Sequence, residues 1–476
     1  MPRRYHVRTY GCQMNLHDSE KVENLLHHAG WRPADGVDDA ELLLLNTCSI
    51  REKAEHRLAS DLGVLREWRS QAPGRVLGVG GCVAQQEGDA LLRRFPHLDF
   101  VFGTHNLRLV PELVAAAGAG ARRAETAESR SQERFDLPER HPAFRGHSPG
   151  RAWLTVMEGC DLFCSFCIVP RTRGREISRP AAAILDEART LAEGGVEELT
   201  LLGQTVNAYG RHDARRGRHE AAGSVPFAEL LAQLDAIPGV RRLRYTSPHP
   251  IFFDEGLIRA HAELETLQPH VHLPLQSGSD RVLERMRRRY DGAQFLRLVE
   301  RLRASRPDLA LTSDLIVGFP GETRADFSET LRVVREAGFV DSYAFKYSPR
   351  PGTAATELPD RVPAEEAQER LEELQTLQRA LTLAYHRRRV GETVEVLVEG
   401  PSRKREPGEA GAGAQLQGRD PYHRVVNFRA PRALRPGAWV RLGLVEATPH
   451  SLIGELAGVQ PSAPLADEIS QPVDLS

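Results

Sequence analysis

The sequence predicts an α/β protein with three parts: an open parallel α/β domain, a partial (βα)6 barrel and a small C-terminal β-barrel. Strand-like and helix-like segments alternate over residues 1–115 and again from residue 151 to about residue 360. Beyond residue 393, short strand-like runs follow one another without helices between them. A chain of 476 residues is also too long for one ordinary core.

The N-terminal part, residues 1–115, contains three strand-like runs, and each precedes a helical pattern. These runs are residues 5–10, 41–45 and 75–79. Each is followed within a few residues by a cysteine: Cys12, Cys48 and Cys82. Ligands bind beyond the carboxyl ends of strands in a parallel sheet, so three such cysteines can converge on one point. The alternative is three small cysteines buried in the core.

Residues 116–148 are rich in Ala, Gly, Glu, Arg and Ser, with scattered prolines. This composition is typical of a linker, and we expect its arginines to be solvated.

The middle part, residues 149–380, contains six strand candidates separated by amphipathic helical patterns. They are residues 153–157, 198–202, 242–246, 271–275, 310–317 and 342–347. Six βα units fit an incomplete barrel with an open side, in which chemistry takes place at the carboxyl ends of the strands. Within this part, residues 211–222 are expected to form a surface loop, and Arg287–Arg289 either a solvated helix end or a phosphate contact.

A cluster of cysteines follows the first barrel strand: Cys160, Cys164 and Cys167. Thiolates this close together, in a chain without extracellular markers, indicate metal ligands. Zinc requires a fourth protein ligand, and none lies nearby in sequence. A 4Fe–4S cluster usually takes four cysteines, so three leave one iron open to a substrate or cofactor. The alternatives are a zinc knuckle with a distant fourth ligand, or buried structural cysteines.

The C-terminal part, residues 385–457, contains four strand-like runs after a long polar helix. They are residues 393–398, 424–428, 438–446 and 451–456. Their length and spacing predict a small barrel of the oligonucleotide-binding kind. The loop 401–405 supplies positive charge for phosphates, residues 406–417 are expected to extend a barrel loop, and the polar tail 458–476 is expected to fray.

The composition excludes several classes of protein. A formal net charge of -2 excludes a uniformly basic nucleic-acid coat. The first residues contain no apolar segment of the signal-peptide kind, and no run of about 18 apolar residues exists. We therefore expect a cytoplasmic protein without a membrane partner, whose six cysteines are reduced and bind metal.

The spacing of Cys160, Cys164 and Cys167 resembles that of the radical S-adenosylmethionine (SAM) superfamily. The resemblance implies that the open iron of a 4Fe–4S cluster binds SAM, which the reduced cluster cleaves to a 5′-deoxyadenosyl radical. It also implies cofactor-binding positions beside the third cysteine and at two strand ends: Phe166, Gly203, Gln204, Ile316 and Gly318.

The segments around the first three cysteines resemble the N-terminal domain of the methylthiotransferases, and the MiaB-type tRNA branch most of all. These segments are residues 11–15, 46–54 and 80–85. The resemblance implies a second, auxiliary 4Fe–4S cluster on Cys12, Cys48 and Cys82. The C-terminal part is similar to the TRAM domain of RNA-modifying enzymes.

The resemblance implies transfer of a methylthio group to C2 of N6-isopentenyladenosine next to the tRNA anticodon. That carbon carries no acidic proton for ordinary base catalysis, so a radical route is chemically reasonable. The expected partners are the anticodon loop of tRNA and a reductant protein, and the chain is expected to be a monomer. The alternatives are methylthiolation of a ribosomal-protein aspartate or of threonylcarbamoyl adenosine, a non-catalytic iron–sulfur RNA-binding protein, and a zinc-binding RNA adaptor.

Overall fold

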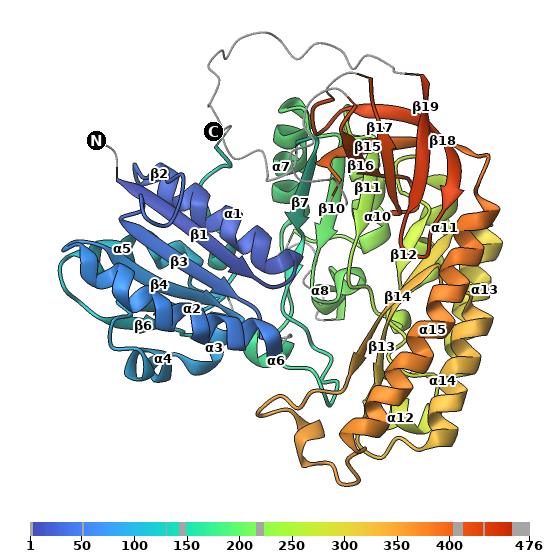
Figure 1. Ribbon diagram of the computed structural model, residues 1–476, viewed down its shortest axis with the longest axis horizontal. Helices are drawn as coiled ribbons and strands as arrows, with labels where there is room; N and C mark the ends of the chain where they lie inside the picture. The colour runs from blue at the N-terminus through green and yellow to red at the C-terminus, as the bar shows by residue number, and fades with distance from the viewer. Residues whose placement is uncertain are drawn as a thin grey trace.

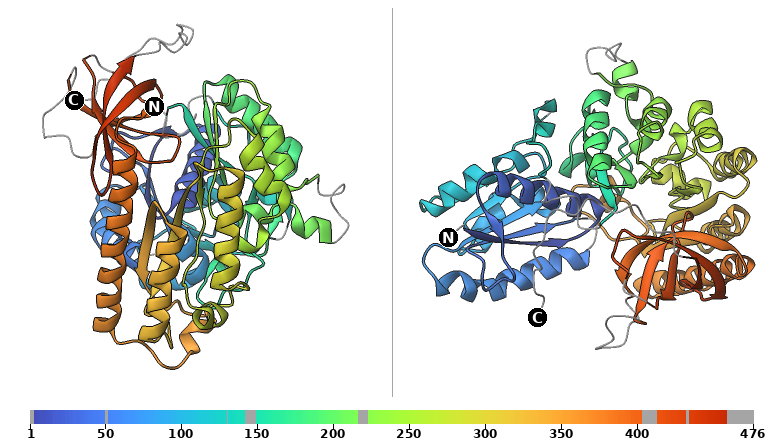
Figure 2. Two further views of the ribbon diagram at one scale, coloured as in Figure 1. Left: turned by 90° about the vertical axis from the view of Figure 1, so that its right-hand side faces the viewer. Right: turned by 90° about the horizontal axis from the view of Figure 1, so that it is seen from above.

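The computed structural model describes residues 3–49, 52–129, 131–141, 149–215, 223–402, 413–431 and 434–458. The basic loop beyond Ser402, most of the loop 406–417, nearly all of the tail 458–476 and the second half of the insertion 211–222 lie outside these ranges. Figure 1 shows an N-terminal α/β domain beside a central barrel, with a small β-barrel at one end of the latter. The two views of Figure 2 show the small barrel where the last long helix ends.

The N-terminal domain is a six-stranded parallel sheet of order β2-β1-β3-β4-β5-β6. Its strands are β1 Arg4–Tyr10, β2 Arg32–Pro33, β3 Leu42–Thr47, β4 Val76–Gly81, β5 Phe100–Phe102 and β6 Arg123–Glu125. Its helices are α1 Gln13–His28, α2 Glu52–Gln71, α3 Cys82–Glu87, α4 Asp89–Arg94 and α5 Val110–Gly118. Both central strands are buried along their whole length, as continuous apolar runs in parallel sheets usually are.

The predicted linker over residues 116–148 contains an edge strand in the part that the structure describes. Arg123–Glu125 pairs in parallel with β5 as the edge strand β6. The prediction of solvated arginines holds for Arg123, which is exposed, but fails for Arg134, whose side chain is buried and forms an ion pair with Glu158. Three residues of mixed polarity carry no strand pattern, and only the neighbouring edge of β5 stabilises them as a strand.

The central barrel consists of six parallel strands, each near its predicted position. They are β7 Arg151–Thr155, β10 Glu198–Leu202, β11 Arg242–Tyr245, β12 His270–His272, β13 Ala310–Val317 and β14 Asp341–Lys346. The strands form two sheets, β11-β10-β7 and β12-β13-β14, joined by a parallel bridge between Leu243 and Leu267. The outer strands of these sheets are β7 and β14, so the predicted incomplete barrel with an open side is confirmed.

Helices cover the outer face of the barrel. They are α7 Ala181–Glu193, α10 Phe227–Asp235, α11 Glu255–Glu263, α12 Asp280–Arg285, α13 Gly292–Ser305, α14 Arg324–Ala337 and α15 Ala364–Arg388, with the short α6 Val169–Thr172 and α8 Arg211–Arg215 in loops. No helix in the described ranges has both the length and the apolar character needed to span a bilayer.

The strand β13 shows how the barrel acquires an interior. Leu315 and Val317 are fully buried in the largest hydrophobic cluster, together with Phe327 of α14. Because side chains alternate along a strand, Asp314 and Ile316 point to the opposite face, into the barrel. The interior is therefore partly polar and differs from the apolar layer beneath the helices.

The C-terminal domain is a closed five-stranded barrel of order β15-β16-β17-β19-β18, which confirms the predicted small barrel. Its strands are β15 Thr393–Pro401, β16 Gln415–Arg419, β17 Val425–Arg429, β18 Trp439–Ala447 and β19 Leu452–Gly458. Strand β16 is not among the predicted strands, and its first residues, 415–417, lie in the segment that was expected to extend a loop. Its polar and glycine residues form a strand because β15 and β17 pair with it on both sides.

The C-terminal barrel packs against the amino ends of the central strands. Glu198 begins β10 and is nearly fully buried, with its carboxylate 3.6 Å from Arg242 Nη1 and 3.4 Å from Arg244 Nε. Arg242 Nη1 also donates to the carbonyl oxygen of Arg419, and Arg244 Nη2 to that of Asp420. These buried arginines therefore join the two barrels.

Replacing Glu198 with alanine should destabilise this junction, because Arg242 and Arg244 lose their buried carboxylate. Breaking a buried ion pair from one side costs about 3–5 kcal/mol, so we expect E198A to lower the midpoint of thermal unfolding by several degrees in scanning calorimetry. The control is D186A, which removes an exposed pair with Arg189 and should cost less than about 1 kcal/mol. Equal midpoints in the two variants would contradict the prediction.

Candidate active site

Three adjacent strands of the N-terminal sheet end at the same level. Tyr10 at the end of β1 pairs with Thr47 at the end of β3, which pairs with Gly81 at the end of β4. The residues that follow these strand ends include Cys12, Cys48 and Cys82. Neighbouring strands lie ~4.8 Å apart, so the three strand ends span roughly 10 Å. The structure therefore brings the three predicted cysteines together.

Two glycines allow the backbone to pack tightly at this edge of the sheet. A Cβ atom on Gly11 would lie 2.6 Å from Cys48 Cβ. A Cβ atom on Gly81, whose φ is +94°, would overlap the side-chain oxygen of Asn46. A side chain at either position would push the strand ends apart, so these glycines maintain the spacing of the cysteines.

The auxiliary cysteines differ in how readily they lose a proton. Hydrogen bonding with Cys48 lowers the pKa of Cys12 to about 6, and the charge of Arg173 acts in the same direction against the effect of burial. Burial raises the pKa of Cys82, while Arg173 opposes that change. The thiolate is the form that binds metal, so the cation beside these thiols favours metal binding.

The second group of cysteines lies on the loop between β8 Met157–Glu158 and α6. Gly159 opens this loop with φ +80°, and a side chain there would overlap the carbonyl oxygen of Arg175. The Gly159 amide donates to Gln204 Oε1 at 2.5 Å, and Cys160 Sγ lies 3.0 Å from Thr205 Oγ1. The end of β10 therefore holds the start of the cysteine loop.

An arginine that the sequence analysis did not assign to the site lies against these cysteines. Burial raises the pKa of Cys160 to about 11 and that of Cys167 to about 12. The buried Arg288 places Nη1 3.5 Å from Cys164 Sγ, and Nη2 donates to the carbonyl oxygen of Pro274. Its guanidinium offsets the cost of thiolates in this apolar loop. Arg288 is therefore neither a solvated helix end nor a phosphate contact.

Both cysteine groups fit iron–sulfur clusters. In the described ranges, no three Cys, His, Asp or Glu side chains are placed to hold a single metal ion. A 4Fe–4S cluster does not require this placement, because it binds each thiolate through a different iron. Several buried polar atoms near the two groups lack hydrogen-bond partners among the residues that the structure describes: Asp18 Oδ1, Thr47 Oγ1, Ser49 Oγ, Arg173 Nη1 and Gln204 Nε2. Buried polar groups usually have partners, so these atoms are consistent with a bound group at each site.

Two of the predicted SAM contacts, Gly203 and Gln204, pack against the start of the cysteine loop and the strand before it. Gln204 anchors Gly159 through Oε1, and its Nε2 is one of the atoms without a partner. A Cβ atom on Gly203 would lie 2.6 Å from Met157 Cγ, so close packing against β8 requires glycine there. Binding of SAM by these residues stays a prediction.

Two of the other three predicted SAM contacts share one apolar cluster, and the third lies against α15. Phe166 and Ile316 both pack against the cluster that contains Phe319, whose ring lies 6.5 Å from that of Phe166. Gly318 has φ +69°, and a Cβ atom on it would lie 2.7 Å from Ala367 Cβ of α15. Helix packing alone therefore explains the glycine, and its contact with SAM also stays a prediction.

The two cysteine groups lie near each other across the domain boundary. Helix α3, which begins at Cys82, contacts α6, which begins two residues after Cys167 (Figure 1). Lys21 of α1 reaches Thr155 Oγ1, at the carboxyl end of β7, at 3.4 Å. The N-terminal domain thus contacts the barrel at the carboxyl end of β7, the end of the strands where the rule for such barrels places the chemistry.

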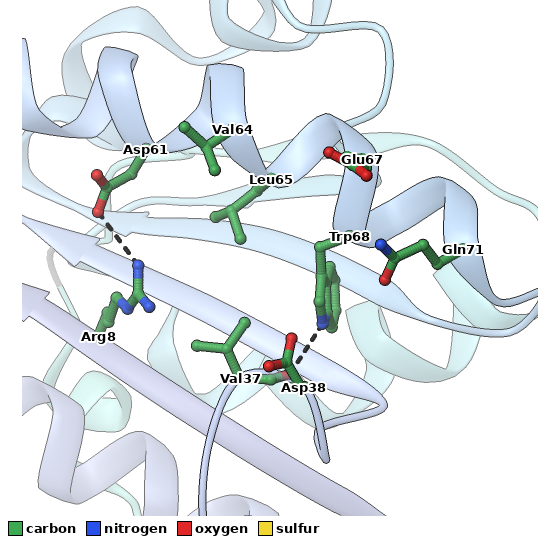
Figure 3. A pocket seen from close by; sticks show the side chains of 9 residues that line it. All are labelled: Arg8, Val37, Asp38, Asp61, Val64, Leu65, Glu67, Trp68 and Gln71. Carbon is green, nitrogen blue, oxygen red and sulfur yellow. Dashed lines mark hydrogen bonds and ion pairs between the residues drawn. The ribbon is translucent and has the colours of Figure 1, made fainter.

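A surface pocket of about 390 Å³ lies between β1 and α2, on the N-terminal domain (Figure 3). Arg8 and Asp61 form an ion pair of 3.3 Å at one end, and Trp68 Nε1 donates to the carbonyl oxygen of Val37 at the other. Its lining contains none of the residues predicted to bind cofactors.

Three family models match the chain. The radical SAM superfamily matches residues 154–334, the uncharacterized protein family UPF0004 residues 4–103, and the TRAM domain residues 387–457. Among solved structures, a radical S-adenosylmethionine methyltransferase from Kitasatospora setae has a TM-score of 0.53 at 16% identity, covering 75% of this chain and 77% of that one. This likeness concerns the fold alone.

Curated relatives are similar over nearly the whole chain. The tRNA-2-methylthio-N(6)-dimethylallyladenosine synthase of Geobacter metallireducens is 47% identical, covering 96% of this chain and 98% of the relative. The protein of the same name from Geobacter sulfurreducens is 46% identical, covering 95% and 97%. With identity this high across all three parts, the chain belongs to the radical SAM family of tRNA-2-methylthio-N(6)-dimethylallyladenosine synthases.

Proposed function

We propose that this chain adds a methylthio group to C2 of N6-isopentenyladenosine next to the anticodon of tRNA. The observation that carries the proposal is the contact between α3, which begins at Cys82, and α6, which follows Cys167, because it brings one three-cysteine group from each domain to the same boundary. A single cluster would suffice for radical formation alone. A second group of thiols nearby supplies a place for the sulfur that is transferred.

Each cysteine group would hold one 4Fe–4S cluster with an open iron. The cluster on Cys160, Cys164 and Cys167 would bind SAM, and the auxiliary cluster would be held by Cys12, Cys48 and Cys82. When bound, the clusters and SAM supply the methylated sulfur and the carbon radical that activates the C2–H bond.

The protein's own contribution is charge, orientation and exclusion of water. Arg288 places a fixed cation beside Cys164, and Arg173 places one beside the auxiliary cysteines. Four of the six cysteines are buried, with Cys12 and Cys167 partly accessible. Partial access at one cysteine of each group is consistent with substrates that enter between the two groups.

The open edge of the barrel presents two exposed aromatic side chains. Tyr343 and Phe345 on β14 are 56% and 44% exposed, while Ala344 between them packs against the outer core. They pair in register with Asp314 and Ile316, which face the interior, so both rings lie at the barrel opening. Adenosine in an anticodon loop must leave its stack to react, and aromatic faces stabilise such bases.

The remaining partners follow from the same function. The C-terminal barrel corresponds to the TRAM match and would provide a second RNA-binding surface. A separate reductant protein would supply electrons, and the chain would act as a monomer in the cytoplasm.

Nucleoside analysis tests the activity directly. In a strain that lacks this gene, mass spectrometry of digested tRNA should show loss of the 2-methylthio-isopentenyl nucleoside, because the C2 position is no longer modified. The wild-type gene should restore it, and a gene encoding Cys160→Ala should not. Persistence of the nucleoside would contradict the proposal. Loss of the methylthio group from threonylcarbamoyl adenosine or from a ribosomal protein would instead favour that molecule as the substrate.

Iron analysis tests the two-cluster arrangement. After anaerobic reconstitution we expect roughly eight irons per chain, from four irons in each cluster. Cys160→Ala and Cys48→Ala should each reduce this to roughly four, while Val64→Ala, at an exposed position, should keep all of them. Loss of all iron in one single variant would contradict separate clusters, and zinc without iron would indicate an adaptor.

Removing the ring of Tyr343 should weaken the reaction with RNA. Stacking of a base on an aromatic side chain contributes about 1–3 kcal/mol, so we expect Tyr343→Ala to reduce kcat/KM for the RNA by ~10-fold. Tyr343→Phe keeps the ring and should be close to wild type. Formation of 5′-deoxyadenosine without RNA and the iron content should not change; a fall in either would show that the residue acts on the cofactor site instead.

A further inference from the structure

A residue of the barrel domain is buried beside the auxiliary cysteines. Arg173 follows α6 on the loop that carries the other cysteine group, and its side chain is only 3% exposed. Its Nη2 lies 2.5 Å from Oδ2 of Asp18, a fully buried residue of α1. The cation in this part of the N-terminal domain therefore comes from the other domain.

In this ion pair, one polar atom of each side chain has no hydrogen-bond partner among the described residues. Arg173 Nη1 and Asp18 Oδ1 are both buried, and neither has a hydrogen-bond partner in the described part of the chain. The charge of Arg173 acts on both Cys12 and Cys82. An unpaired buried donor is costly, so its presence beside these two thiols points to an acceptor that the thiols hold.

The charged side chains around Arg173 include more cations than anions. Around Asp18 and Glu158, which are both buried carboxylates, lie Arg173, Arg134 and Lys21. These five residues include one cation more than they include anions, and all but Lys21 are buried. A cluster on three thiolates carries negative charge, which increases on reduction, and nearby charges and hydrogen bonds set its reduction potential.

We propose that Arg173 sets the reduction potential of the auxiliary cluster. The fixed charge of Arg173 raises this potential, and the carboxylate of Asp18 limits the increase. This inference rests on the proposed two-cluster function. It also gives the cysteine loop of the barrel a second role, because the loop that holds one cluster supplies the cation for the other.

The inference predicts shifts of opposite sign from the two partners. Losing the cation in Arg173→Gln should make the midpoint potential of the auxiliary cluster more negative, whereas losing the anion in Asp18→Asn should make it more positive. The double variant should lie between them. A merely structural ion pair would instead lower thermal stability in both single variants without shifts of opposite sign.

The measurement uses the full chain with Cys160, Cys164 and Cys167 replaced by alanine, so that all iron belongs to the auxiliary site. Iron and sulfide content come first, followed by a redox titration monitored by electron paramagnetic resonance. Arg173→Lys, which keeps the charge, should retain most of the wild-type potential. The control is Arg175→Gln, two residues further along the same loop, whose exposed side chain pairs with Asp161; it should change nothing.

The possible failures can be told apart. If the triple-alanine chain binds no iron, the two-cluster function fails and this inference fails with it. If it binds roughly four irons but the potential stays the same in Arg173→Gln and Asp18→Asn, only the role of Arg173 is overturned.

Discussion

Buried ion pairs between the N-terminal domain and the barrel are the constraint on which the active site depends. Arg173 of the cysteine loop is paired with Asp18 of α1, and Glu158 after β7 is paired with both Arg134 and Lys21. Charges buried to this degree are stable only with their partners in place, since an unpaired one costs several kcal/mol. The relative position of the two cysteine groups therefore follows from charge pairing as much as from apolar packing.

Both α/β domains place their candidate functional side chains at the carboxyl ends of parallel strands, and the two domains contact each other there. The N-terminal domain contacts the barrel at the carboxyl end of β7. The C-terminal barrel occupies the opposite end, where Glu198, Arg242 and Arg244 hold it against the amino ends of the strands. In the proposed function, the substrate base enters by the open side between β7 and β14, where Tyr343 and Phe345 are exposed.

Elements with a strong local pattern could be predicted from the sequence, and weakly patterned ones could not. The apolar run at residues 42–45 and the alternation of strands and helices in the barrel indicated the correct architecture. The edge strand β6 and the barrel strand β16 were missed, because polar residues and glycine carry no strand signal. Both segments become strands because they pair with neighbouring strands, β5 and β15, whose apolar residues form strands more readily.

The sequence by itself predicted which side chains would bind iron, because the spacing of Cys160, Cys164 and Cys167 and the position of the other cysteines after strand-like runs are local properties. The structure alone decided which arginines act on them. Arg173 and Arg175 stand two residues apart in the same basic loop, yet the side chain of the first is 3% exposed and that of the second 46%. Burial depends on what the rest of the chain packs against a residue, and that information is not local.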